Sequence, residues 1–346
     1  MRTTELIQDL SKGINEDKTH NLTLIQAITS GLDQLLEQNE EALILGQDVG
    51  RNGGVFRATE GLFEKYGEER VIDTPLAESG IIGTSIGLAM NGFRPIAEIQ
   101  FFGFIYPALN QIITHATRIR GRTLGRYSVP MVIRTPYGAG VRAPEIHSDS
   151  LEALFTHLPG IKVVVPSNPY DAKGLLIASY NDPDPVLFLE PMKLYRAGRK
   201  EVPHSLYEVP LGKGRIVKAG QDLSLFAWGA MGSVAEKAAE KLEKEEGISC
   251  EVIDLRTLYP LDKTLVKESV EKTGRVLIVH EAHQTGGVGN QLISLINDEE
   301  SAFLSLKAPI QSVTGPDVPV PMFALEDAYL PNIERIIERG KFLINY

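Results

Sequence analysis

The sequence predicts two α/β domains, each a mostly parallel sheet with helices on both faces. The first observation is a length of 346 residues, enough for about two domains that each bury a core. The second is a series of short, wholly apolar runs that alternate with segments of helical periodicity. Strands of this kind are buried on both faces, which favours parallel sheets. The third is an interruption at residues 191–213, which divides the series in two.

The first series occupies residues 22–190 and follows a polar arm at residues 1–21. Its opening helix is indicated by apolar residues at Leu22, Ile25, Ile28 and Leu32, which share one helical face. The strands are expected at residues 42–45, 70–73, 94–101, 131–134, 161–165 and 185–190. The helices are expected at residues 22–36, 60–65, 78–91, 107–118, 151–158 and 171–180.

The second series occupies residues 214–346 and is expected to form the second domain. Residues 191–213 contain Pro191, Pro203 and Pro210 together with several charges, a composition typical of a linker. Strands are expected at residues 223–228, 250–255, 275–280 and 310–313. Helices are expected at residues 233–243, 263–272, 289–296 and 332–341.

The overall charge argues against several classes of partner. The chain carries 45 acidic and 35 basic residues, a formal net charge of −10, which disfavours binding to nucleic acid or to an anionic membrane surface. Cys250 is the only cysteine, so an intrachain disulfide and a thiolate zinc cluster are both excluded. No stretch approaches the roughly 20 apolar residues of a membrane span. We expect a cytoplasmic protein.

Residues 73–83 combine a carboxylate with a glycine-rich helix start. Pro75 keeps the preceding residue extended, and Glu78 follows where the helix should begin. Gly80, Gly83 and Gly87 recur on one helical face. An acid at the positive end of a helix dipole, with glycines that admit a close neighbour, would explain the pattern without catalysis. A functional carboxylate is the alternative.

The loops after the strands are the expected ligand site, because open α/β sheets bind ligands beyond the carboxyl ends of their strands. In the first domain these loops carry Asp48, Glu78, the aromatic run at residues 101–104 and His147. His147 could act as a general acid or base, or it could be a loop histidine that hydrogen-bonds Asp149. The aromatic residues could stack on a flat ligand or belong to the core.

Two further motifs are better explained by structure than by cofactor or metal binding. Residues 138–143 match a dinucleotide-binding fingerprint, but Pro144 interrupts the helix that should hold the pyrophosphate. His280 and His283 flank a glutamate, yet they are three residues apart at a strand end, whereas the helical zinc motif needs a spacing of four. Neither a nicotinamide cofactor nor a metal is expected at these positions.

Taken together, these segments resemble the beta subunit of the thiamine-diphosphate-dependent 2-oxo acid dehydrogenases, the decarboxylating component of the pyruvate and branched-chain complexes. The resemblance covers residues 22–346. It is carried by residues 53–57, 73–83, 94–101, 147–148, 159–164, 171–176 and 252–257. It implies a transketolase-like pyrimidine-binding domain followed by a transketolase C-terminal-like domain.

The resemblance also implies roles for single residues. The glutamate matching Glu78 hydrogen-bonds N1′ of the aminopyrimidine and promotes the loss of the thiazolium C2 proton. The histidine matching His147 is expected to act as an acid or hydrogen-bond donor around acyl transfer to a lipoyl arm. Phe104 falls where the family places an aromatic residue against the pyrimidine, and Leu76 and Gln100 should line the same pocket.

The motif that holds the diphosphate in this family, Gly-Asp-Gly followed by Asn, does not occur in the sequence. In this family an alpha subunit carries the motif and holds Mg²⁺, so the chain should be active only in an assembly of two alpha and two beta subunits. The glycine face of Gly80, Gly83 and Gly87 is the expected contact between subunits. Further expected partners are the subunit-binding and lipoyl domains of the acyltransferase.

Substrate and ion are less well defined by the resemblance. Phe104 suggests a pyruvate enzyme, while residues 284–287 are similar to the branched-chain type, so the 2-oxo acid is undecided. A potassium site would map to Met131, Ser179, Asp182 and Asp184, although Asp184 replaces the usual asparagine. Two alternatives remain: a split transketolase acting on sugar phosphates, and a noncatalytic assembly subunit that docks on the acyltransferase.

Overall fold

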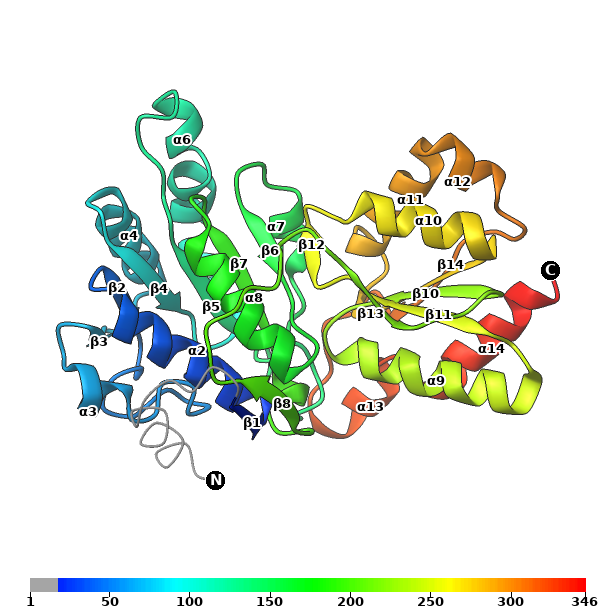
Figure 1. Ribbon diagram of the computed structural model, residues 1–346, viewed down its shortest axis with the longest axis horizontal. Helices are drawn as coiled ribbons and strands as arrows, with labels where there is room; N and C mark the ends of the chain where they lie inside the picture. Colours follow the sequence, from blue (N-terminus) through cyan, green and yellow to red (C-terminus); the bar gives the residue numbers. More distant parts are fainter. Residues whose placement is uncertain (1–17) are drawn as a thin grey trace. The chain divides into compact units, whose positions relative to one another are not determined.

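The computed structural model describes residues 18–346, which form two compact units (Figure 1). Unit 1 contains residues 18–137 and 157–211, and unit 2 contains residues 138–156 and 212–346. Each unit is a sheet flanked by helices, which confirms the predicted fold class. Residues 1–17 of the expected polar arm lie outside the described part of the chain. Within residues 18–346, no helix combines the length and the apolar character needed to cross a membrane.

The sheet of unit 1 is parallel throughout. Its strand order is β6-β7-β5-β4-β2-β3, and each neighbouring pair runs in the same direction. The strands are β2 (Ala42–Gly46), β3 (Val71–Asp73), β4 (Arg94–Glu98), β5 (Val132–Tyr137), β6 (Lys162–Val164) and β7 (Val186–Pro191). Every residue of β2, β5 and β7 is buried, as expected for strands covered on both faces.

Two helices of unit 1, α2 and α8, begin at side-chain caps encoded in the sequence. Thr23 and Gln26 form a capping box at the start of α2, and the Asn168 side chain accepts the N–H of Asp171 in α8. Gly31 of α2 faces Leu176 of α8, where an added Cβ would lie 3.2 Å from the leucine side chain. The helices are α2 (Leu24–Gln38), α3 (Leu62–Tyr66), α4 (Glu78–Met90), α5 (Leu109–Gln111), α6 (Ile119–Arg122) and α8 (Pro169–Asn181).

The helix expected at residues 107–118 is broken into short pieces. A 3₁₀ helix, η1 (Phe102–Ala108), is followed by α5, by the π-helical turn η2 (Ile112–Ala116) and then by α6. Pro107 lies inside η1, and a proline has no N–H to donate to the preceding turn. The apolar periodicity predicted one helix because it reports which face is buried and not how the backbone hydrogen bonds continue.

Residues 191–211, expected to be part of a linker, contain ordered structure that belongs to unit 1. They include the 3₁₀ turn η3 (Met192–Leu194) and β8 (Lys200–Pro203), which pairs antiparallel with β1 (Thr19–Leu22). The rings of His20 in β1 and of His204, the residue after β8, are buried, with Nε2 of the first 3.1 Å from Nδ1 of the second.

Unit 2 has a sheet of strand order β14-β13-β10-β11-β9, parallel except for the pair formed by β9 and β11. The strands are β9 (Arg215–Lys218), β10 (Leu223–Ala227), β11 (Cys250–Asp254), β13 (Val276–His283) and β14 (Gln311–Gly315), and the short strand β12 (Thr257–Tyr259) is not part of this sheet. The central strands β10 and β11 are buried at every residue.

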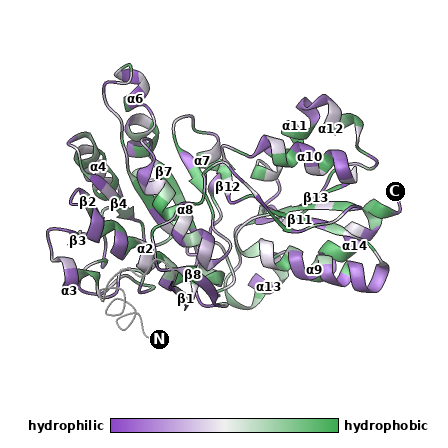
Figure 2. Cartoon of the chain, viewed as in Figure 1, coloured by the Kyte–Doolittle hydropathy of each residue, from purple (hydrophilic) through white to green (hydrophobic). Residues whose placement is uncertain are grey.

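In Figure 1, α9 and α14 lie on one side of this sheet, and α10, α11 and α12 lie on the other. Figure 2 shows hydrophobic and hydrophilic residues side by side on α9, as expected for a helix with one face on a core. The helices are α7 (Glu152–Thr156), α9 (Ala230–Glu246), α10 (Lys263–Thr273), α11 (Val288–Asp298), α12 (Glu300–Leu304), α13 (Glu326–Tyr329) and α14 (Ile333–Ile344), and η4 (Phe323–Leu325) is a 3₁₀ turn.

Candidate functional site

Three adjacent strands of unit 1 end at the same edge of the sheet. Because β4, β2 and β3 are neighbours and parallel, the residues that follow them share this edge. The loop after β3 is held there by the Thr74 N–H, which donates to the carbonyl of Gly46 at 2.9 Å. The Asp73 carboxylate accepts the N–H groups of Gly50 at 2.6 Å and Arg51 at 3.1 Å. These bonds join the β3 loop to the β2 loop.

Glu78 is the first residue of α4 and is half-buried. The preceding residue, Ala77, has φ −159° and ψ 82° and contributes no side-chain cap, so Glu78 supplies the acidic group of the first turn. Its carboxylate lies at the positive end of the helix dipole. Leu76, two residues earlier, exposes 69% of its surface. An acid and an exposed apolar side chain therefore flank the turn from β3 into α4.

Gln100 comes from the loop after β4 and reaches the loop after β2. Its Nε2 donates to the Asp48 carboxylate at 3.1 Å and, at 3.4 Å, to the carbonyl of Gln47. The expected strand at residues 94–101 stops at Glu98, which frees the residues after it to turn toward the edge. Phe104 in η1 is half-buried, with its ring centroid 5.3 Å from that of Phe101 in an edge-to-face arrangement. Phe102, in contrast, is a core residue.

The fifth predicted site residue, His147, belongs to unit 2, whereas Leu76, Glu78, Gln100 and Phe104 belong to unit 1. Its backbone N–H donates to the carbonyl of Pro144 at 3.2 Å. Its Nδ1 lies 2.8 Å from the carbonyl oxygen of Glu145, and since a carbonyl only accepts, Nδ1 carries the proton. Nε2 is therefore the nitrogen that has the lone pair when the ring is neutral.

Comparisons with known proteins match two successive parts of the chain to two families. Residues 20–198 match the family described as "Transketolase, pyrimidine binding domain", and residues 212–336 match "Transketolase, C-terminal domain". The pyruvate dehydrogenase E1 component subunit beta of Acholeplasma laidlawii is 51% identical over 315 residues, covering 91% of this chain and 95% of that protein. The subunit of the same name from Bacillus subtilis is 51% identical over 325 residues, covering 94% and 99%.

The chain belongs to the family of pyruvate dehydrogenase E1 beta subunits. It is thus the beta subunit of a 2-oxo acid dehydrogenase. A solved structure titled "Split gene transketolase, inactive beta4 tetramer" matches with a TM-score of 0.75 at 24% identity, covering 94% of this chain and 99% of that one. At this identity the likeness concerns the fold alone.

The two motifs with a structural explanation lie in a buried strand and in a loop. His280 lies buried in β13, stacked on Trp228 with ring centroids 5.0 Å apart, and burial lowers its pKa to about 4. Within residues 18–346, no group of three or more histidines, cysteines, aspartates or glutamates is placed to hold a metal ion. Residues 138–143 form a loop rather than the start of a helix, so they offer no N-terminal dipole to a pyrophosphate.

The donors expected to bind potassium already have partners within the protein. The Asp182 carboxylate accepts Lys162 Nζ at 2.8 Å, and the Asp184 carboxylate lies 2.6 Å from Arg120 Nε. The Met131 carbonyl accepts the N–H of Val186 at 3.0 Å. The Ser179 hydroxyl donates to the carbonyl of Leu175. Two basic side chains thus already neutralise the acids of this site.

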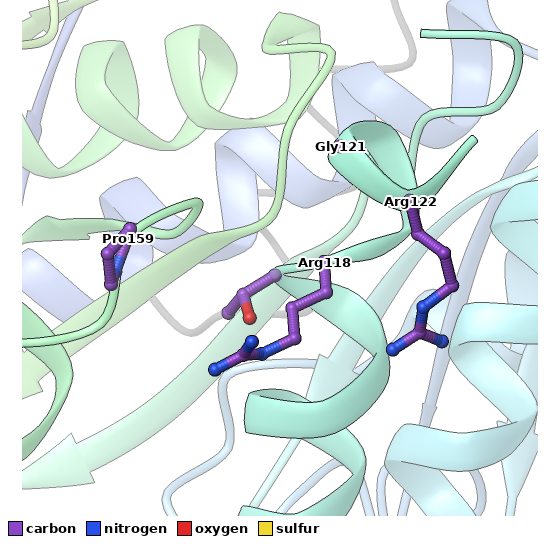
Figure 3. Close-up of a pocket in the computed structure, with 5 residues that line it drawn as sticks. Arg118, Gly121, Arg122 and Pro159 are labelled. Carbon is purple, nitrogen blue, oxygen red and sulfur yellow. The ribbon is translucent and has the colours of Figure 1, made fainter. Parts of the chain in front are cut away.

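A basic hollow in unit 1 was not predicted from the sequence. It has a volume of about 430 Å³ and is lined by Thr117, Arg118, Gly121, Arg122 and Pro159 (Figure 3). Arg118 Nε donates to the carbonyl of Ile113 at 2.9 Å, and an Arg122 guanidinium nitrogen donates to the carbonyl of Thr114 at 2.7 Å. The two arginines are four residues apart in the sequence, and this spacing is the feature that could have indicated the hollow.

Proposed function

We propose that this chain is the beta subunit of a pyruvate dehydrogenase, in which it supplies the pyrimidine side of a thiamine diphosphate site. The observation that carries the proposal is Glu78 at the first residue of α4, on the ligand-binding edge of a parallel sheet. The relatives that are about half identical over nearly the whole chain support pyruvate as the 2-oxo acid. A branched-chain substrate is the alternative outcome.

The residues of this edge fit an aminopyrimidine. Glu78 would accept a hydrogen bond from the ring and hold a proton at that position, while the exposed Leu76 and the half-buried Phe104 offer apolar surface to its faces. Gln100 would line the same pocket, fixed by its bond to Asp48. When bound, thiamine diphosphate supplies a carbon nucleophile that adds to the keto group and accepts the electrons left by carbon dioxide.

The site needs a second chain. The sequence has no Gly-Asp-Gly motif for the diphosphate and Mg²⁺, so an alpha subunit would hold both, in an assembly of two alpha and two beta subunits. Gly80 and Gly87 of α4 are exposed, and an added Cβ at Gly87 would meet nothing within 4 Å. Open glycine backbone on this helix suits close packing by another subunit.

His147 is proposed to serve the transfer of the acyl group to the lipoyl domain of an acyltransferase. Because Nδ1 donates to the Glu145 carbonyl, Nε2 is the atom that would hold or release a proton toward the reacting groups. The acyltransferase would also bind this chain through its subunit-binding domain.

Co-expression with an alpha subunit, followed by assays with thiamine diphosphate and Mg²⁺, tests the function. Glu78→Gln is expected to lower the rate of pyruvate decarboxylation by at least about 100-fold, since a positioned proton-transfer group contributes 10² to 10⁴. Glu69→Gln changes an exposed acid of the same unit and is the matched control. Full activity in Glu78→Gln would favour a noncatalytic assembly role. Activity on pentose phosphates but not on 2-oxo acids would favour a split transketolase.

A further inference from the structure

The loop of residues 138–151 that carries His147 has an unusual backbone. Gly138 and Gly140 have φ of +84° and +106°, and the non-glycine residues Arg142 and Ile146 have φ of +55° and +61°. A non-glycine residue in this region is disfavoured by roughly 1–3 kcal/mol and persists only where its surroundings enforce it. Since Val141 and Ile146 are exposed, the loop is not held in this shape by a core of its own.

Two buried carboxylates of unit 2 bind the main chain of this loop. Glu281 of β13 accepts the N–H of Ala139 at 2.8 Å, and it is 4% exposed. Glu326, the first residue of α13, accepts the N–H of Arg142 through both oxygens at 3.2 and 3.1 Å, and it is 1% exposed. Hydrogen bonds to an ionised carboxylate are about twice as strong as neutral ones. Buried acids therefore hold the main chain of a loop whose residues 141–146 are mostly exposed.

The first anchor explains a glycine of the loop. An added Cβ at Gly138 would lie 2.5 Å from Oε1 of Glu281, closer than real Cβ contacts. The positive φ of Gly138 adds to the requirement. Gly138, which in the sequence is part of the run that suggests a nucleotide fingerprint, is thus needed for the approach of the loop to Glu281.

The second anchor is connected to His147 through short hydrogen-bonded steps. Glu326 fixes the main chain at Arg142, and two residues later Pro144 accepts the backbone N–H of His147. The imidazole is then oriented by the Glu145 carbonyl. The position of the ring thus depends on the turn at residues 144–147, and that turn follows directly on the residue that Glu326 holds.

We propose that Glu326 is a positioning residue that sets where His147 Nε2 lies, with Glu281 as the second anchor of the same loop. This inference rests on the proposed role of His147 in acyl transfer. Asp327 provides a natural comparison because it also contacts Arg142, through an ion pair of 2.7 Å between side chains that are 61% and 68% exposed. Exposed pairs of this kind contribute little, so Asp327 should be dispensable.

The test uses the full chain co-expressed with its alpha subunit, as wild type and as Glu326→Ala, Glu326→Gln and Asp327→Asn. Trypsin cleavage after Arg142, followed by mass spectrometry, reports release of the loop without reference to activity. Glu326→Ala is expected to be cleaved at this bond at least about 10-fold faster and to lose about 10- to 100-fold in kcat for acylation of a lipoyl domain, since a shift of about 1 Å can have this effect. Decarboxylation with an artificial electron acceptor should fall by less than about 3-fold.

Glu326→Gln keeps an acceptor oxygen and is expected to recover most of the acylation rate, and Asp327→Asn should match wild type in every assay. Unchanged cleavage and unchanged acylation in Glu326→Ala would overturn the positioning role. Faster cleavage in Glu326→Ala, combined with full acylation by both that variant and His147→Ala, would support the anchor and overturn the proposed role of His147. The thermal midpoint of each variant shows whether the substitution unfolds the protein as a whole. If Glu326→Ala does so, the cleavage and acylation rates of Glu326→Gln test the positioning role instead.

Discussion

The guanidinium of Arg134 and the carboxylate of Glu190 form a two-bond ion pair inside unit 1, with Nε–Oε1 and Nη2–Oε2 distances of 2.7 and 3.1 Å. Nη1 of the same arginine donates to Glu98 at 2.8 Å, and the Tyr195 hydroxyl donates to Glu190 at 2.7 Å. All four side chains are buried. Burial raises the pKa of Glu98, and the charge of Arg134 opposes that shift. The network fixes the end of β4, two residues before Gln100.

Replacing Arg134 by methionine is therefore expected to destabilise unit 1 by about 3–5 kcal/mol, because two buried carboxylates would lose their cation. Urea denaturation followed by circular dichroism measures the change. The control is Lys267→Ala, which removes an exposed partner of Glu271 four residues away and should change stability by less than about 0.5 kcal/mol. Equal effects of the two substitutions would contradict the importance of the buried network.

The parallel strands could be predicted from sequence because each is a continuous apolar run whose burial is encoded locally. The pairing of β1 with β8 could not, since Thr19 and Pro203 are far apart in the chain and both strands are short and partly polar. Likewise β9 lies at the edge of its sheet and has no apolar run. Such strands are defined by their partners more than by their own residues.

Some residues of the candidate site could likewise be predicted from the sequence, and others could not. The position of Glu78 at the start of α4 could be predicted from the sequence because Pro75 and the glycines mark the turn into this helix. The anchors Glu281 and Glu326 could not, because they lie more than a hundred residues from the loop whose N–H groups they accept. Their acidic side chains look like surface residues in the sequence, and only the fold buries them.

Because Lys173 is buried, the folded chain is expected to become more stable as pH rises. Its Nζ is buried and donates to the carbonyls of Pro203, His204 and Ser205, and burial lowers its pKa from 10.5 to about 7. Between pH 7 and 10.5 the Lys173 side chain is protonated in the unfolded chain but neutral in the folded one. The folded state therefore gains stability as pH rises, by up to about 1.4 kcal/mol per pH unit. Below pH 7 the contribution is constant.

Lys173→Met is expected to lack this rise. Urea midpoints of wild type and variant, measured from pH 7 to 10, should differ by an amount that changes with pH. Methionine leaves the three carbonyls without their donor, but that loss does not depend on pH. A difference that is constant over the range would contradict the assignment of a depressed pKa to Lys173.

Because ion pairs are present at the expected cation site, we expect the thermal stability of the chain not to depend on potassium. Because Lys162 and Arg120 neutralise Asp182 and Asp184, exchanging K⁺ for tetramethylammonium at constant ionic strength should leave the thermal midpoint within about 1 °C, a change below about 0.5 kcal/mol. Arg120→Ala removes one of the two cations and is expected to make the midpoint rise with K⁺. Arg126→Ala, in the same region, is the control, and a clear K⁺ dependence of wild type would refute the prediction.

His147→Ala is expected to separate the two halves of the reaction. The ring is fixed through Nδ1, so the loss of Nε2 should slow acylation of a lipoyl domain by at least about 10-fold more than it slows decarboxylation measured with an artificial electron acceptor. His157→Ala removes an exposed histidine ten residues later and should affect neither rate. Equal losses in both steps would mean that His147 acts on an intermediate common to them, or on substrate binding, and not chiefly on the transfer.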